Sequence, residues 1–304
     1  MTRVALAPEG ARSYLSEAIT AGGGEVVGAG EAEVLVWAIP TGSDDLDGVL
    51  RANPGIEWVQ LPWAGVEPVI EVVRAHRERV WTCGKGVYAE EVAEHALTLA
   101  LAGRRGLATY ARARTWLPPE GHNLLGAKVV ILGGGGITES LLRLLGPFGA
   151  EVTVVRRRPQ PMAGATEVVG SENLYDALDG ADVVFLALAL TSETVGIVDE
   201  RALSAFAPGA WLVNVARGAH VVTDDVLDAL RSGRLGGAAL DVTDPEPLPD
   251  GHPLWTEPRC IITPHVANTP EMALPVLSRR VTENLRRWAA GEPLLGMVDA
   301  DLGY

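Results

Sequence analysis

A glycine-rich loop, Gly133-Gly134-Gly135-Gly136-Ile137-Thr138, has the residue types needed to bind a pyrophosphate. It lies between an apolar run and a predicted helix, and it fits the pattern G-x-G-x-x-T at Gly133, Gly135 and Thr138. Glycine at the first two places permits a tight turn and lets backbone N–H groups approach the phosphates. Thr138 stands where the fingerprint has a third glycine, and its side chain is expected to push the helix slightly outward. We expect a dinucleotide cofactor to bind at Gly133, Gly135, Gly136 and Ile137; the alternative is a glycine-rich turn with no ligand.

Three consecutive arginines, Arg156, Arg157 and Arg158, come at the end of the next predicted strand. An acidic residue at this place would hydrogen-bond the adenosine ribose of NAD, whereas an arginine cluster attracts the 2′-phosphate of NADP. The sequence therefore favours NADP as the cofactor, with NAD still possible. The alternative interpretation is a solvated basic loop.

The composition is that of an acidic chain with two folded domains. Its 304 residues suggest about two domains. The formal net charge of −14 makes nucleic acid and membrane surfaces poor partners. The two cysteines, Cys83 and Cys260, are too far apart in sequence for a Cys-based zinc motif or a disulfide scaffold, and they fit a reducing cytoplasm. The histidines show no metal-binding spacing, and no apolar run approaches the ~18 residues of a membrane span. We expect a cytoplasmic protein with no metal.

Short apolar strands alternate with helices along the chain, which predicts parallel sheets covered on both faces. The clearest strands are 4–7, 34–37, 58–61, 129–132, 151–155, 181–188, 211–215, 238–242 and 260–263. A long helix over 89–104 is expected to connect the two series, and the helical segment after residue 270 is expected to pack back on the first domain. We therefore predict an α/β fold with two doubly wound parallel-sheet domains. A flavodoxin-like substrate-binding domain, 1–94 and 271–304, would be discontinuous, and a Rossmann dinucleotide-binding domain, 95–270, would be inserted in it.

Polar residues follow several strands of the second series. Arg217, Glu246 and His265 come after the strands that end near residues 215, 242 and 263. Ligands of open α/β sheets bind beyond the carboxyl ends of the strands, so these side chains and the glycine loop should converge on one edge. Taken singly, each residue also has an ordinary structural explanation.

At this point the sequence resembles a known family. The chain resembles the D-isomer-specific 2-hydroxyacid dehydrogenases in the motifs Asn214-x-x-Arg217-Gly218, Glu246-Pro247-Leu248 and Thr263-Pro264-His265. The spacings of 29 residues from Arg to Glu and 19 residues from Glu to His also resemble that family. Similarity to the glyoxylate/hydroxypyruvate reductase A branch of that family is found at residues 216–222, 253–255 and 298–304. The resemblance covers most of the chain from about residue 63 onward.

The resemblance implies a reductase that uses NAD(P)H to convert a small 2-oxo acid, such as glyoxylate or hydroxypyruvate, to a D-2-hydroxy acid. Arg217 would bind the substrate carboxylate with its planar fork of donors, which a lysine could not match. His265 would act as general acid/base, since an imidazole has an ordinary pKa near ~6.5. Glu246 would hold the other ring nitrogen and fix the tautomer.

The resemblance also assigns residues around the reacting groups and implies a homodimer. Backbone amides of Ala64 and Gly65 would bind the substrate carboxylate, with Trp63 and Lys85 as further substrate contacts. Ala216 and Asp241 would lie beside the cofactor. Lys85 could equally be a surface lysine, and Trp63 a core residue. Two other functions stay open: a dehydrogenase for a larger 2-hydroxy acid such as phosphoglycerate, and a catalytically weak dinucleotide-sensing binding protein.

Overall fold

The computed structural model describes residues 1–10, 12–39 and 42–304 and divides into two compact units. Unit 1 contains Met1–Tyr88 and Thr269–Tyr304, and unit 2 contains Ala89–Asn268. The predicted boundaries, after residues 94 and 270, differ from this division. A boundary after residue 94 would cut helix α4 (Ala89–Arg104), which stays whole because its buried face packs on helix α6 (Gly136–Leu145) within unit 2.

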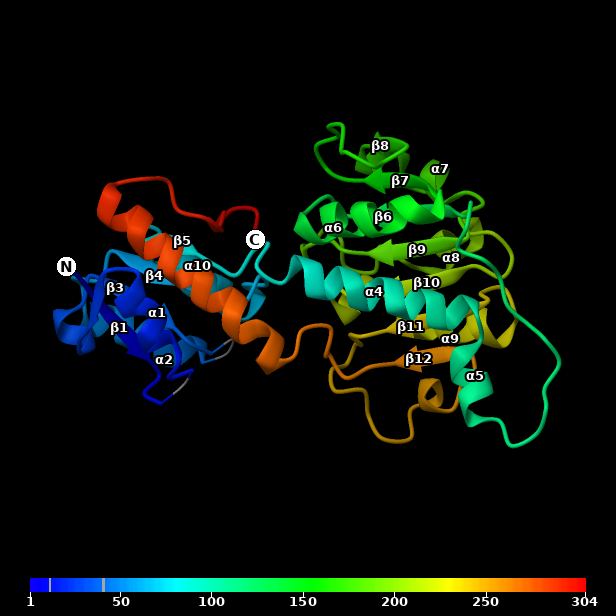
Figure 1. Ribbon diagram of the computed structural model, residues 1–304, viewed down its shortest axis with the longest axis horizontal. Helices are drawn as coiled ribbons and strands as arrows, with labels where there is room; N and C mark the ends of the chain where they lie inside the picture. The colour runs from blue at the N-terminus through cyan, green and yellow to red at the C-terminus, as the bar shows by residue number, and fades with distance from the viewer. Residues whose placement is uncertain (11, 40–41) are drawn as a thin grey trace. The chain divides into compact units, whose positions relative to one another are not determined.

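The described residues of unit 1 form a five-stranded parallel sheet in the order β2-β1-β3-β4-β5 (Figure 1). The strands are β1 (Thr2–Ala7), β2 (Gly24–Val26), β3 (Val34–Trp37), β4 (Trp58–Gln60) and β5 (Val80–Thr82). This is the strand order of the flavodoxin-like fold. The sequence did not predict β2 and β5, the short strands at the two edges of this sheet, each of which pairs with one neighbour.

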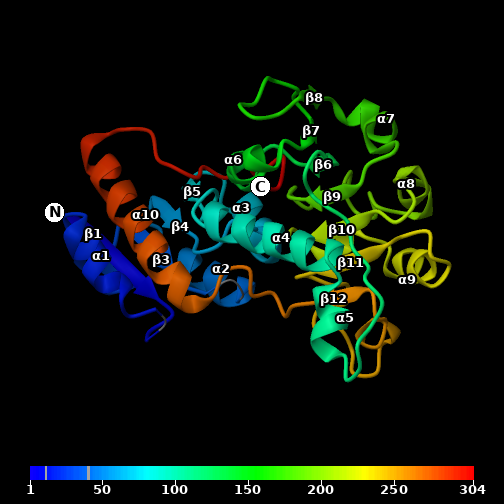
Figure 2. The ribbon, with the colours of Figure 1, turned by 45° about the vertical axis from the view of Figure 1, so that its right-hand side comes forward.

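Helices cover both faces of this sheet. On one face, α1 (Leu15–Ala21) lies alongside α10 (Pro270–Ala290), as Figure 2 shows, and the two helices bury Ile19, Leu277 and Val281 against the strands. On the other face, α2 (Ser43–Ala52) and α3 (Ile70–Ala75) cover a second core. The C-terminal helix therefore packs back on the first domain, as predicted.

Unit 2 contains a seven-stranded parallel sheet in the order β12-β11-β10-β9-β6-β7-β8. The strands are β6 (Lys128–Leu132), β7 (Glu151–Val155), β8 (Glu167–Val169), β9 (Val183–Leu186), β10 (Trp211–Asn214), β11 (Gly237–Leu240) and β12 (Cys260–Ile262). The chain reverses its direction across the sheet between β6 and β9, the position where Rossmann folds bind dinucleotides. The predicted α/β class with two doubly wound parallel sheets is confirmed. The short strand β8 was not predicted.

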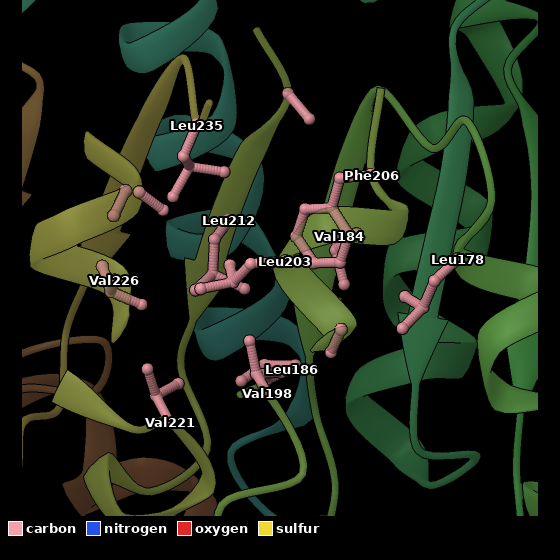
Figure 3. Close-up of a cluster of buried hydrophobic side chains, with 14 of the residues drawn as sticks. Leu178, Val184, Leu186, Val198, Leu203, Phe206, Leu212, Val221, Val226 and Leu235 are labelled. Carbon is pink, nitrogen blue, oxygen red and sulfur yellow. The ribbon is translucent and has the colours of Figure 1, made fainter. Parts of the chain in front are cut away.

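Two hydrophobic cores, one on each face, hold this sheet in place. Helices α4 and α6 cover one face. Helices α7 (Leu174–Leu178), α8 (Glu200–Ala205) and α9 (Thr223–Arg231) cover the other, where Leu203, Phe206 and Leu212 interdigitate (Figure 3). The central strands are buried on both faces, so they are continuous apolar runs and not alternating ones. The remaining helix α5 (Leu107–Arg112) follows α4. Within the described ranges, no helix is long and apolar enough to cross a membrane.

Candidate active site

The glycine loop after β6 needs glycine at its first position. Gly133 has a φ of +113°, and its N–H donates to the carbonyl oxygen of Val155 at 2.8 Å. A Cβ atom at Gly133 would overlap the carbonyl group of Ala187, in the loop after β9. The loop therefore passes so close to its neighbour that only glycine fits.

The next residues leave open space at a helix N-terminus. Gly135 precedes α6 with extended backbone, no side chain caps the helix, and a Cβ at Gly135 would meet nothing within 4 Å. The first-turn N–H groups of an α-helix lack intrahelical partners and, with the helix dipole, attract anions. Thr138 is fully buried, and its hydroxyl donates to Gly133 O at 2.9 Å, closing the turn from inside. The described residues thus fit a dinucleotide pyrophosphate.

Arg156 lies directly against this loop. Its side chain covers Gly134, where an added Cβ would come within 2.7 Å of the arginine Cδ and Nε atoms. Arg156 is half-buried, whereas Arg157 and Arg158 are exposed. The positive charge predicted at the end of β7 therefore lies beside the cofactor loop for Arg156, and at the surface for the next two residues.

A buried asparagine shapes the loop that carries Arg217. Asn214, at the end of β10, has no exposed surface; its Oδ1 accepts from Ala216 N at 3.0 Å, and its Nδ2 donates to Arg217 O at 2.8 Å. Arg217 is half-buried and its Nη1 donates to Ala216 O at 2.7 Å. At Gly218, a Cβ would overlap the carbonyl of Thr243. Only glycine therefore lets the Arg217 loop touch the loop that leads to Glu246.

Asp241, which directly follows β11, organises the loop after β12. It is 2% exposed, and its carboxylate accepts from the Thr263 hydroxyl at 2.6 Å, from Val266 N at 3.0 Å and from Ala267 N at 3.1 Å. His95 Nε2, on α4, lies 3.3 Å from Asp241 Oδ1 and 3.1 Å from the Thr263 hydroxyl. The carboxylate of Asp241, which we expected beside the cofactor, thus binds loop residues that precede His265 and loop residues that follow it.

The pKa of Asp241 reflects two opposing effects. Burial raises it, but the hydrogen bonds from His95 and Thr263, followed by the two backbone amides, outweigh burial and hold the pKa below its ordinary value. Asp241 therefore stays ionised at neutral pH, and its charge is what binds the loop.

His265 and Glu246 form a close pair at the same edge of the sheet. His265 Nδ1 lies 2.7 Å from Glu246 Oε1, and the two side chains are 53% and 42% exposed. The backbone of His265 has a φ of +53°, which is unusual for a residue with a side chain, and its N–H donates to Asp241 O at 2.8 Å. Among the described residues, nothing hydrogen-bonds to His265 Nε2, so this atom can meet a substrate.

The predicted substrate residues Trp63, Ala64, Gly65 and Lys85 lie in unit 1. They occupy the loops after β4 and β5, at the carboxyl end of its sheet, and the two loops are joined by a hydrogen bond from Gly84 N to Trp63 O at 2.8 Å. Ala64 is exposed. The Nζ atom of Lys85 lies 4.8 Å from the ring centroid of Tyr304, so this exposed lysine has a defined aromatic neighbour.

Sequence reasoning missed two residues of this arrangement. His95 belongs to none of the motifs found in the sequence, yet its ring contacts Asp241 and Thr263. No local signal could have found this contact, because Thr263 lies 168 residues further along the chain. Asn214 appeared only as part of a motif, and its double hydrogen bond to the loop needs the tertiary structure. Within the described ranges, no cluster of His, Cys, Asp and Glu side chains could hold a metal ion.

Comparisons with known proteins give this geometry a context. Residues 76–267 match the sequence profile described as D-isomer specific 2-hydroxyacid dehydrogenase, NAD binding domain. The chain belongs to the D-isomer specific 2-hydroxyacid dehydrogenase family. The match includes nearly all of unit 2, which is therefore the NAD-binding domain of this dehydrogenase. The predicted family and enzyme class are confirmed.

The dehydrogenase has relatives with similar length and fold. A glyoxylate/hydroxypyruvate reductase A from Serratia proteamaculans is 35% identical over 285 residues, which cover 89% of this chain and 87% of the relative. An uncharacterized protein from Corynebacterium melassecola is 38% identical over 82% of this chain and 84% of its own. A D-isomer specific 2-hydroxyacid dehydrogenase from Xanthobacter autotrophicus Py2, solved in complex with NADPH and MES, superimposes with a TM-score of 0.85 at 27% identity. That superposition covers 100% of this chain and 99% of the other.

Proposed function

We propose that this dehydrogenase reduces a small 2-oxo acid of the glyoxylate or hydroxypyruvate kind to the D-2-hydroxy acid, with NADPH as the preferred cofactor. The observation that carries the proposal is the His265–Glu246 pair at 2.7 Å, on the sheet edge that also bears the glycine loop and Arg217. The reductase named above, at 35% identity over most of both chains, supports the substrate class.

In this proposal the guanidinium of Arg217 binds the substrate carboxylate and polarises the adjacent carbonyl. The planar guanidinium of Arg217 carries its donors in a fork that matches the geometry of a carboxylate. In unit 1, Ala64 is exposed with Gly65 next to it, and we assign their backbone amides to a substrate carboxylate. We accordingly assign substrate binding to the loops of unit 1, dinucleotide binding to unit 2 and carboxylate binding to the guanidinium of Arg217.

His265 is the residue that transfers the proton in this proposal. Reduced nicotinamide, when bound, supplies the hydride that forms the new C–H bond at the carbonyl carbon. The carbonyl oxygen takes a proton from His265 Nε2, which leaves a neutral imidazole and a 2-hydroxy acid. Glu246 accepts the hydrogen bond of the Nδ1–H, so it fixes the tautomer and stabilises the imidazolium before the proton leaves. The hydrogen bonds of Asp241 to the surrounding loop keep the ring in place.

The preference for NADPH rests on Arg156. Its side chain lies against Gly134, beside the loop where the pyrophosphate would bind, so its charge is close to the adenosine ribose. A guanidinium that binds a 2′-phosphate contributes about 1.5–3 kcal/mol, or roughly tenfold to a hundredfold in affinity. The relative from Xanthobacter, which was solved with NADPH, supports this choice. NAD stays a second cofactor with lower affinity.

The two alternatives fit less well. A dehydrogenase for a larger substrate such as phosphoglycerate would gain from a cluster of cations at the Trp63–Gly65 loop, whereas that loop has none of its own and has the single guanidinium of Arg12 against Trp63. A protein that only binds the dinucleotide would not need a histidine that has left-handed backbone and is paired with a glutamate, as His265 is with Glu246. We therefore rank the reductase first.

We further propose that two copies of the chain associate and that the enzyme acts in the cytoplasm. The segment around α5 presents large apolar side chains to solvent: Trp116 is fully exposed, and Leu107 and Leu125 are more than half exposed. A second copy would cover such side chains. Sedimentation velocity tests this: Trp116→Asp should lower the dimer fraction. The two cysteines, both buried and unpaired, fit a reducing compartment.

The experiment is an assay of NADPH oxidation at 340 nm with a panel of 2-oxo acids. His265→Asn should lower kcat by about 10²–10⁴-fold and leave NADPH binding intact, because the ring is the proton donor and not a cofactor ligand. His122→Asn, an exposed histidine outside the site, is the matched control and should not change the rate. Near-normal turnover by His265→Asn, or no turnover of any 2-oxo acid by the native enzyme, would overturn the proposal.

A further inference from the structure

Two non-glycine residues of the described chain have a positive φ: His265, at +53°, and Arg12, at +47°. Left-handed backbone costs a residue with a side chain about 1–3 kcal/mol and persists where the surrounding structure enforces it, often at functional sites. The mechanism already uses His265. Nothing in the proposed reaction uses Arg12, which lies in the loop after β1 of unit 1.

Two neighbouring loops and Tyr14, two residues further along the chain, hold the side chain of Arg12. Its Nε donates to the carbonyl oxygen of Ala38, after β3, at 2.8 Å, and its Nη1 donates to the Tyr14 hydroxyl at 3.2 Å. The guanidinium carbon lies 4.5 Å from the ring centroid of Trp63, after β4. Trp63 also packs on Tyr88, whose hydroxyl donates to Pro62 O at 2.6 Å. Backbone strain, hydrogen bonds and ring stacking therefore all fix the plane of one guanidinium.

Arg12 also has donors to spare and no counter-charge. Guanidinium carries five N–H groups, and the two bonds above use two of them. No carboxylate forms an ion pair with Arg12 within the described ranges, although the chain has an excess of 14 negative charges. A half-buried cation without a carboxylate partner, stacked on an aromatic ring, is suited to bind an oxygen acceptor from outside.

The position of Arg12 beside Trp63 indicates which part of a substrate would supply the oxygen acceptor. Trp63, on which it stacks, directly precedes Ala64 and Gly65, the amides to which the proposed function gives the substrate carboxylate. A group that lies against Trp63 is therefore a near neighbour of the carboxylate end and can meet a substituent on the next carbons of a short substrate. We propose that Arg12 is a specificity residue that binds the oxygen substituent on carbon 3 of a 2-oxo acid, with Trp63 as its platform. This inference rests on the proposed function.

The experiment compares two substrates that differ at that carbon alone. Hydroxypyruvate has a hydroxyl on carbon 3, and pyruvate has a hydrogen in its place. The readout is the ratio of kcat/KM for hydroxypyruvate to kcat/KM for pyruvate. Arg12→Asn is the main variant, because asparagine tolerates left-handed backbone and lets the loop keep its path. The ratio should fall by about tenfold to a hundredfold, the range expected for loss of a hydrogen bond to a charged group.

Two further variants separate the outcomes. Arg12→Lys keeps the charge but loses the planar fork and stack, so the ratio should fall several-fold; this variant carries the test if Arg12→Asn does not fold. Arg51→Asn is the matched control, since Arg51 is a 73% exposed arginine of unit 1 that pairs with Asp47, and it should leave the ratio as in the native enzyme.

The inference has clear contrary results. A ratio within twofold of the native value in a folded Arg12 variant overturns it, including the case in which both substrates lose activity equally, because Arg12 would then only hold the loop. A similar change in Arg51→Asn overturns it as well. Native enzyme that reduces neither these acids nor any other 2-oxo acid overturns the proposed function and this inference with it, so the two failures are distinguishable.

Discussion

Asp241→Asn tests how the loop that carries His265 is held. The substitution keeps the size of the side chain, but it removes the charge and replaces one carboxylate oxygen by an amide NH₂ group. The carboxylate of Asp241 accepts from Thr263, Val266 and Ala267 at 2.6–3.1 Å and pairs with His95 at 3.3 Å. Asparagine can keep the partners of one oxygen, whereas its NH₂ group would face a donor on the other side.

The magnitude follows from these contacts. A hydrogen bond to a charged group contributes about 1.5–3 kcal/mol, and a buried donor left without an acceptor costs about 1–3 kcal/mol. Because Asp241 is 2% exposed, water cannot replace the lost acceptor. We expect the free energy of unfolding to fall by about 2–4 kcal/mol, which lowers Tm by roughly 5–15 °C for a unit of this size. We also expect kcat to fall at least ~10-fold, because His265 loses its fixed position.

The assays are thermal unfolding and the 340 nm assay, and the pH dependence gives a second test. The pKa of Asp241 lies below its ordinary value, so its contribution to stability is present above the unfolded pKa, near ~4, and disappears as the pH falls through the folded pKa. The Tm difference between the native enzyme and Asp241→Asn should thus be full at pH 7 and shrink below about pH 4.

Asp199→Asn is the matched control for this variant. Asp199 caps α8 in the same unit by accepting from Ala202 N at 2.8 Å. Its replacement makes the same chemical change away from the site, and it should cost at most ~1 kcal/mol with no effect on kcat. Equal Tm values for Asp241→Asn and Asp199→Asn, or a Tm difference from the native enzyme that does not depend on pH, would refute the reasoning.

Two other variants test the substrate and cofactor assignments. Arg217→Lys should raise KM and lower kcat for 2-oxo acids, because the charge survives but the bidentate geometry does not; steady-state constants equal to the native ones would place the substrate carboxylate elsewhere. The native enzyme should prefer NADPH to NADH by about tenfold or more in kcat/KM, with a preference that shrinks as salt rises, and Arg156→Asp with Arg157→Ala should reverse the order. A native preference for NADH would mean that the arginine cluster is only a solvated loop.

Local sequence was sufficient for those parts of this protein in which neighbouring residues cooperate. The strands of unit 2 are visible because burial on both faces requires continuous apolar runs, as in β9 and β10. The glycine loop is visible because its turn, its helix and its phosphate-binding amides all lie within six residues. Arg217, Glu246 and His265 could be placed on one edge because parallel strands all end on the same side of a sheet.

Other features depend on residues that are far apart in sequence. The strands β2, β5 and β8 have three residues each and lie at the edges of their sheets, so pairing with one neighbouring strand, not their own pattern, makes them strands. The first domain boundary fell at residue 88 because α4 packs as one rigid helix on unit 2.

The sequence by itself therefore determined the fold class and pointed to the residues that we propose as reacting groups, whereas the tertiary structure decided how those residues are held. The contact of His95 with Thr263 spans 168 residues, and Arg12 reaches Ala38 across 26 residues before it stacks on Trp63. Such contacts leave no periodicity or spacing in the chain. They arise only when the folded sheet brings the loops at its carboxyl edge together, and a buried charge or a strained backbone then finds the partners that stabilise it.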